Sequence, residues 1–98
     1  MYMPTRFIWD ENKNRANRRK HKISFETATK VFTDPYVVIH PDQCVEGEQR
    51  WQAIGSVEGL SIILVAHTAR DEGGGEVIRI ISARKATTTE RKSYEEAN

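Results

Sequence analysis

Apolar residues recur at helical spacing in the first third of the chain and then give way to extended, β-branched stretches. The opening apolar run, residues 6–9 (RFIW), predicts a short strand. Asp10 is a suitable N-cap for a polar helix that reaches about Lys20. Ser24 can cap a second helix that stops before Pro35, and its apolar positions would face a core: Phe25, Ala28, Val31 and Phe32.

After Pro35 the pattern is that of a sheet. Four segments rich in β-branched and aromatic residues are separated by turn-forming residues; they cover residues 36–40, 50–57, 60–70 and 76–83. We expect consecutive antiparallel strands, with a tight turn at Glu58 and Gly59 and a flexible turn at residues 71–75. Thr87 and Glu90 have the spacing of a capping box, which predicts a short C-terminal helix.

This order of elements indicates one α+β domain over residues 1–98. We expect the N-terminal strand and two helices to pack on an antiparallel sheet of about four to five strands, followed by the C-terminal helix. A chain of 98 residues can bury a single core but not two independent ones. One sheet face would therefore be covered by the two early helices, and the other would be left for another purpose.

The composition, 38% hydrophobic and 30% charged, is ordinary for a soluble globular domain. The apolar stretches are too short to cross a bilayer and the start lacks the pattern of a secretory signal, so we expect a cytoplasmic protein that does not bind membranes. Cys44 is the only cysteine, which excludes an internal disulfide. His40, Asp42 and Cys44 lack a second ligand cluster, and we expect neither a metal nor a cofactor.

The net charge of +1 conceals a basic run. Between Lys13 and Lys22 the chain carries six Lys or Arg residues, one His and no acid. Local asymmetry of this kind can attract a polyanion even when the whole molecule is nearly neutral. Taken alone, the run is explained more simply as a solvated helix face.

Two assumed strand registers bring three basic residues together. A hairpin symmetric about Gly73 places His67 opposite Arg79, and a two-residue turn at residues 58–59 places Arg50 opposite His67. The three side chains would then form one row on the face away from the helices. Flanking guanidiniums would keep the imidazole neutral, able to accept a ribose 2′-hydroxyl proton while they bind the phosphate. Alternatively, His67 packs within the sheet and the arginines pair with Glu48 or Glu76.

The sequence also resembles the BrnT-type toxins of bacterial type II toxin-antitoxin systems, which adopt a RelE-like fold. The resemblance covers nearly the whole chain and depends on the order and spacing of individually weak motifs. These are WDENK (9–13), N-x-x-K-H (17–21), SFETA (24–28), GEQRWQAIG (47–55), HTAR (67–70), IRIISARKA (78–86) and ERKSY (90–94). A glycine usually follows the Lys-His pair in this family; Lys22 stands there in this chain and must adopt or alter a left-handed helix end.

The resemblance implies a metal-independent endoribonuclease toxin that cleaves RNA, inhibits translation and arrests growth. It further implies a BrnA-like antitoxin with a DNA-binding domain, which neutralises the toxin in a hetero-oligomeric complex on operator DNA. The candidate catalytic residues are His67, Arg79 and Arg50, and the candidate RNA-binding residues are Lys20, Arg70, Arg84 and Lys85. Two alternatives remain open: a nucleic-acid-binding module without chemistry, and a degenerate toxin that only binds its antitoxin.

Overall fold

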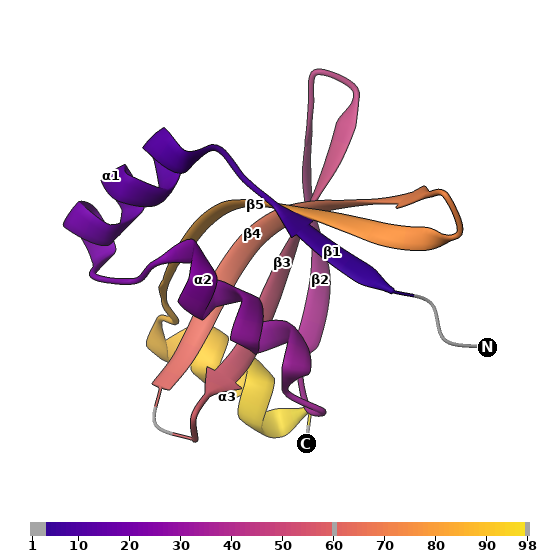
Figure 1. The fold of residues 1–98 in the computed structure, drawn as a ribbon. Helices are drawn as coiled ribbons and strands as arrows, with labels where there is room; N and C mark the ends of the chain where they lie inside the picture. Colours follow the sequence, from indigo (N-terminus) through magenta and orange to yellow (C-terminus); the bar gives the residue numbers. More distant parts are fainter. Residues whose placement is uncertain (1–3, 60, 98) are drawn as a thin grey trace.

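The computed structural model describes residues 4–59 and 61–97 (Figure 1). Five strands form one sheet in the order β1-β5-β4-β3-β2. Among the described residues, no helix is long and apolar enough to cross a membrane. The elements are β1 (Thr5–Ile8), α1 (Glu11–His21), α2 (Phe25–Ala28), the 3₁₀ helix η1 (Thr29–Thr33), β2 (Val38–Val45), β3 (Glu48–Val57), β4 (Ser61–Glu72), β5 (Gly75–Lys85) and α3 (Thr88–Glu96).

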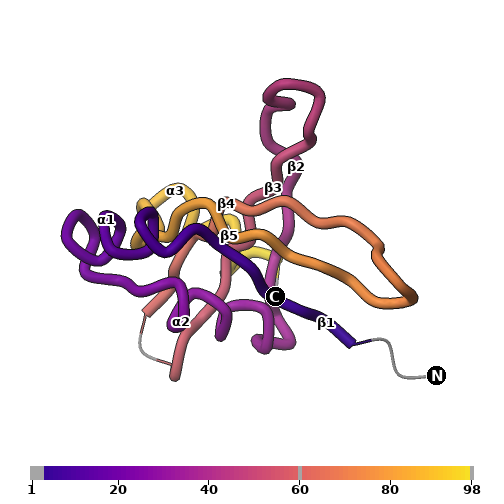
Figure 2. The backbone as a smooth tube through the Cα atoms, turned by 45° about the horizontal axis from the view of Figure 1, so that its top comes forward, coloured from indigo at the N-terminus to yellow at the C-terminus, as the bar shows by residue number. Residues whose placement is uncertain are grey.

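The sheet is mixed rather than purely antiparallel. The strands from β2 to β5 pair antiparallel with their neighbours as expected, but β1 lies beside β5 and runs parallel to it, with Thr5 opposite Glu76. Helix α2 and η1 lie across one face of the sheet, and α3 lies across the other (Figure 2). The predicted α+β fold is therefore confirmed, with a parallel edge strand added and the second face partly covered by α3.

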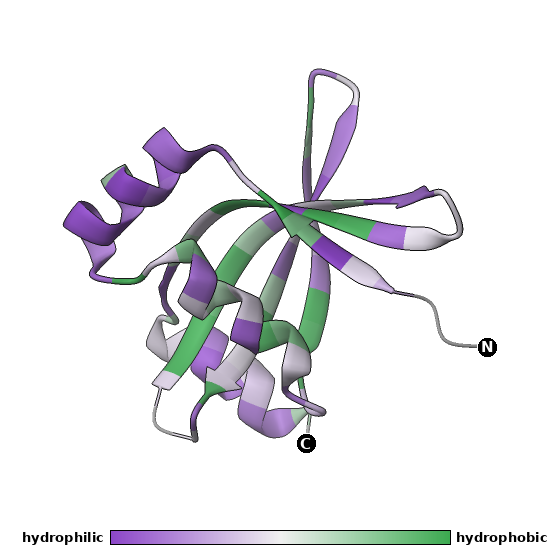
Figure 3. Ribbon diagram, in the orientation of Figure 1, coloured by the Kyte–Doolittle hydropathy of each residue, from purple (hydrophilic) through white to green (hydrophobic). Residues whose placement is uncertain are grey.

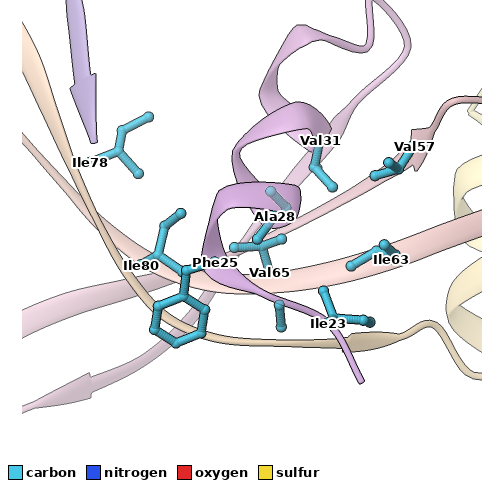
Figure 4. Close-up of a cluster of buried hydrophobic side chains, with 11 residues drawn as sticks. Ile23, Phe25, Ala28, Val31, Val57, Ile63, Val65, Ile78 and Ile80 are labelled. Carbon is cyan, nitrogen blue, oxygen red and sulfur yellow. The ribbon is translucent and has the colours of Figure 1, made fainter. Parts of the chain in front are cut away.

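The main core lies between the α2–η1 segment and the sheet. Phe25, Ala28 and Val31 are fully buried against strand residues such as Val65 and Ile80 (Figure 4). The predicted second helix forms from its Ser24 cap, but it continues after Ala28 as a 3₁₀ helix. Gly55 permits this close approach, because a Cβ atom there would lie 2.9 Å from Val31 Cγ1.

Helix α1 is polar on almost every side (Figure 3), and buried asparagines attach it to the domain. The Asn17 amide donates to the carbonyls of Ile23 and Ala83 at 2.8 Å each and accepts from the Ala83 N–H at 3.1 Å. Asn14 accepts from the Phe25 N–H at 2.8 Å. Lys22 ends the helix in the left-handed conformation (φ 62°), so the non-glycine residue adopts the turn that its position requires.

A capping box begins helix α3, and a tyrosine attaches the helix to the rest of the domain. Thr87 and Glu90 form the predicted box. The Tyr94 hydroxyl donates to Asp34 Oδ2 at 2.6 Å, and Asp34 also accepts from the Ser56 N–H at 2.7 Å. Partial burial acts to raise the pKa of Asp34, but these hydrogen bonds outweigh it and hold the pKa below its usual range. The hydrogen bond to Asp34 raises the pKa of Tyr94 to about 12.

Candidate functional site

The strand registers differ from those expected by one residue. Val57 pairs with Ser61, whereas a two-residue turn at residues 58–59 would pair it with residue 60. Gly73 and Gly74 form the turn of the next hairpin, both with positive φ, so that this hairpin is not centred on Gly73 alone. A register slip of one residue moves a side chain to the opposite face of a sheet.

The expected row of Arg50, His67 and Arg79 is therefore wrong. His67 pairs with Trp51 on β3 and with Ile80 on β5, on the face that α2 and η1 cover. Arg79 lies opposite Thr68 instead. A bulge between Ala66 and His67 changes the register again further along β4.

His67 is buried among core side chains. It is 2% exposed, and its ring meets the Phe32 ring edge-on at a centroid distance of 4.9 Å. Its Nδ1 lies 3.3 Å from the Val65 carbonyl oxygen. Burial lowers the pKa of His67, and the hydrogen bond to Val65 only partly opposes this. A neutral imidazole was expected, but burial rather than flanking arginines produces it.

Two hairpins diverge beside His67. Pairing of β3 with β4 runs from Val57–Ser61 to Trp51–His67, and beyond that last pair the β2–β3 and β4–β5 hairpins point in different directions (Figure 1). We call this place the hairpin split. Arg79 on β5 forms an ion pair with Glu48 on β3, which joins the two hairpins. The expected alternative, an arginine paired with Glu48, is thus found for Arg79.

Arg50 lies on the same face as this ion pair. Successive side chains of a strand point to opposite faces of the sheet. Trp51 pairs with His67 and shares its face, so the side chains of Arg50 and Glu48 point to the other face. Its Nε is buried and has no hydrogen-bond partner in the described part of the chain. An unpaired buried donor on a cation is costly unless an anion completes it. Glu48, Arg50 and Arg79 form the cluster that we call the guanidinium site.

Three of the four expected RNA-binding residues meet elsewhere. A surface groove of about 510 Å³ lies between the end of α1 and the end of β5, and we call it the basic groove. Its lining residues are Lys20, His21, Lys22, Arg84, Lys85 and Thr87. The expected residue Arg70 lies apart from them on the β4–β5 hairpin, where it pairs with Glu72 at 2.9 Å.

Arg84 is already engaged within this groove. Its guanidinium binds both carboxylate oxygens of Glu90, at 2.7 and 2.9 Å. The same contacts raise the pKa of Arg84 and lower the pKa of Glu90 to about 2. Because Glu90 also belongs to the capping box, Arg84 links β5 to α3.

The structure adds residues that the sequence did not identify as functional. The sequence pattern indicates Glu48 only as a partner for an arginine, and Trp51 only as a core residue. Both flank Arg50 within the GEQRWQAIG motif, which was the available signal. Among residues 4–59 and 61–97, no three His, Cys, Asp or Glu side chains gather where they could hold a metal ion.

Comparison with known proteins agrees with the fold and the motifs. Residues 9–90 match the family described as ribonuclease toxin, BrnT, of type II toxin-antitoxin system. The fold is similar to that of the Brucella abortus ribonuclease toxin BrnT, whose crystal structure was solved at 1.1 Å. The two are 28% identical with a TM-score of 0.66, over 87% of this chain and 100% of that one. No curated protein matches the chain. The match over residues 9–90 confirms the resemblance seen in the motifs: the chain belongs to the BrnT family of ribonuclease toxins of type II toxin-antitoxin systems.

Proposed function

We propose that this toxin is a metal-independent endoribonuclease whose scissile phosphate binds at the guanidinium site. The observation that carries the proposal is the ion pair of Arg79 with Glu48, together with the buried and unpaired Nε of Arg50, which lies two residues along β3 on the same face. A phosphodiester supplies the anionic oxygens that such guanidiniums bind, and two arginines provide the positive charge that a metal supplies in other nucleases.

The proposed reaction is transesterification by the ribose 2′-hydroxyl. Arg50 and Arg79 bind the phosphate oxygens, so that phosphate competes with Glu48 for Arg79. The carboxylate of Glu48 then accepts the 2′-hydroxyl proton, and the 2′-oxygen attacks phosphorus. The bond between phosphorus and the 5′-oxygen breaks, and the 5′-oxygen takes up a proton from solvent water. The products are a 2′,3′-cyclic phosphate and a 5′-hydroxyl. Glu48 takes the role first considered for His67, because the ring of His67 lies on the opposite face.

The basic groove offers further phosphate contacts along the RNA chain. Lys20 and Lys85 are exposed there and make no ion pair within the described residues. Neighbouring basic side chains of α1 extend this positive surface: Arg15, Arg18 and Arg19. Such contacts add affinity without reading sequence. Arg84 contributes mainly by holding α3, and Arg70 is occupied by Glu72.

Cleavage of a labelled RNA in the presence of EDTA tests the proposal. The wild-type protein should release fragments with 2′,3′-cyclic phosphate ends, and Arg79→Ala should slow cleavage by about 100-fold or more. Arg6→Ala, which removes another exposed ion-paired arginine, is the matched control and should cleave normally. A folded Arg79→Ala protein with wild-type activity would show that the site is misplaced. No cleavage by the wild-type protein would refute the reaction.

Membership of a type II system implies a cognate antitoxin. We infer a BrnA-like DNA-binding antitoxin that covers the hairpin split in a hetero-oligomer and represses the operon from operator DNA, with the free toxin acting on cytoplasmic RNA. The alternatives are a degenerate toxin and a non-catalytic binding module. Lys22 completes the helix end despite its departure from the family pattern, which favours an intact toxin. Growth arrest on expression without the antitoxin, abolished by Arg79→Ala, would separate these possibilities.

A further inference from the structure

A pocket of about 360 Å³ opens on the helix side of the hairpin split, and we call it the ring pocket. Three aromatic rings contribute to its walls, those of Phe32, Trp51 and His67. The aliphatic side chains of Ile39 and Ile78 also line it. Arg70, Asp71 and Glu76 provide its charged groups. The proposed chemistry does not use this arrangement of flat apolar walls and polar groups.

The walls suit a planar aromatic ligand. The buried ring of His67 meets Phe32 edge-on, so the position of the partly exposed Phe32 ring is set before any ligand arrives. Trp51 is partly exposed, and its indole N–H makes no hydrogen bond within the described residues. Unpaired bases in RNA are commonly held by stacking on such rings, with hydrogen bonds to their edges.

The charges of the pocket indicate which part of a nucleotide it accepts. Arg70 is paired with Glu72, whereas Asp71 and Glu76 are exposed cross-strand partners, so two carboxylates lie side by side. Carboxylates repel a phosphate but accept hydrogen bonds from base N–H groups. Guanine presents adjacent N1–H and N2–H donors to a single carboxylate, whereas the uracil edge has one N–H between two carbonyls. The pocket therefore favours a base over a phosphate, and guanine over uracil.

The pocket and the guanidinium site occupy the two sides of the same split. Trp51 follows Arg50 along β3, and Ile78 precedes Arg79 along β5, with the members of each pair on opposite faces. We propose that the ring pocket binds an unpaired nucleobase of the RNA, guanine in preference, next to the phosphate held by Arg50 and Arg79. This inference deepens the proposed ribonuclease function and rests on it for the identity of the polymer.

Tryptophan fluorescence can test base binding without any cleavage. The chain has two tryptophans, so Trp9→Phe leaves Trp51 as the only reporter. Guanosine 5′-monophosphate should quench this fluorescence saturably and bind at least about fivefold more tightly than uridine 5′-monophosphate. Ribose 5-phosphate, which has no base, should quench little, and N-acetyltryptophanamide corrects for light absorption by the nucleotide.

A variant that fills the pocket separates this inference from the ribonuclease itself. Ala69→Leu adds bulk to a lining residue, and Ala16→Leu adds the same bulk on the exposed surface of α1. In the Trp9→Phe background, Ala69→Leu should lose the quenching and Ala16→Leu should keep it. Quenching that survives in the folded Ala69→Leu protein, or that ribose 5-phosphate also produces, would overturn the inference.

The remaining outcomes distinguish the two proposals. RNA cleavage without saturable nucleotide quenching would overturn the inference of base binding and leave the proposed ribonuclease intact. Guanosine monophosphate binding that Ala69→Leu abolishes, in a protein that cleaves no RNA, would support the pocket and refute the reaction.

Discussion

Arg79 on β5 binds Glu48 on β3 across the strand that separates them. The cross-strand partner of Arg79 is Thr68, so its side chain passes over β4 to reach the neighbouring hairpin. Both partners remain partly exposed, at 32% and 45% of their side-chain surface, so a phosphate can reach the pair. The ion pair thus orients the arginine, and in the proposed reaction Glu48 competes with the phosphate for Arg79.

Glu48→Gln should separate binding from chemistry. Removal of a negative charge beside the phosphate should leave RNA affinity unchanged or increase it, whereas loss of the base should reduce the cleavage rate by about 100-fold or more. Single-turnover cleavage and fluorescence anisotropy measure the two quantities. Glu46→Gln, in the exposed turn of the same hairpin, is the control and should match the wild type. Equal loss of affinity and rate would assign Glu48 to the support of Arg79 alone.

Asn17→Ala should destabilise the protein by about 3 kcal/mol or more. The substitution leaves one N–H and two carbonyl groups, from Ile23 and Ala83, without their partner in a buried place. Urea unfolding followed by circular dichroism measures the free energy. Asn12→Ala on the same helix removes an exposed amide and should change stability by less than about 0.5 kcal/mol. A small effect at both positions would show that α1 is held by other contacts.

The buried His67 should make folding sensitive to mild acid. Its pKa is lowered in the folded state, so the unfolded chain binds more protons as the pH falls below about 6.5. Stability is therefore greatest above this pH and declines as the pH falls toward the folded-state pKa. His67→Phe keeps a ring against Phe32 and should lose less stability between pH 7 and 5.5 than the wild type does.

The control for this pH dependence is His40→Phe, which alters an exposed imidazole. It should follow the wild-type curve of unfolding free energy against pH. If His67→Phe also follows that curve, the acid sensitivity originates in other groups.

Local signals in the sequence were sufficient to predict most elements. Asp10, Ser24 and the Thr87–Glu90 box all cap the helices expected of them, because capping involves residues within one turn of each other. The anchoring of α1 could not be predicted in this way. Asn17 is a polar residue of the kind usually found at the surface. Only its contact with Ala83, 66 residues away, explains why it is buried.

The sequence pattern draws attention to Arg50 and Arg79 but does not predict how the side chains around them are arranged. Arg50 and Arg79 do share a face, but His67 does not, because each of two turns sets its register one residue away from the simplest assumption. The dipeptide Glu58-Gly59 does not by itself determine that a two-residue turn forms. The bulge beside His67 has no recognisable local sequence pattern. A register difference of one residue therefore places Glu48, rather than His67, beside Arg79.

The adjacent residues Arg84 and Lys85 should have different roles. Arg84 is bound by Glu90, so Arg84→Ala should loosen α3 and lower stability by about 1 kcal/mol, with little change in RNA affinity.

Lys85 is exposed in the basic groove, so Lys85→Ala should leave stability unchanged and weaken RNA binding. For Lys85→Ala, the slope of log affinity against log salt concentration should be smaller in magnitude by about one than for the wild type, as expected for one lost phosphate contact. Anisotropy titrations at several salt concentrations measure this slope, and a wild-type slope for Lys85→Ala would exclude the basic groove from the RNA path.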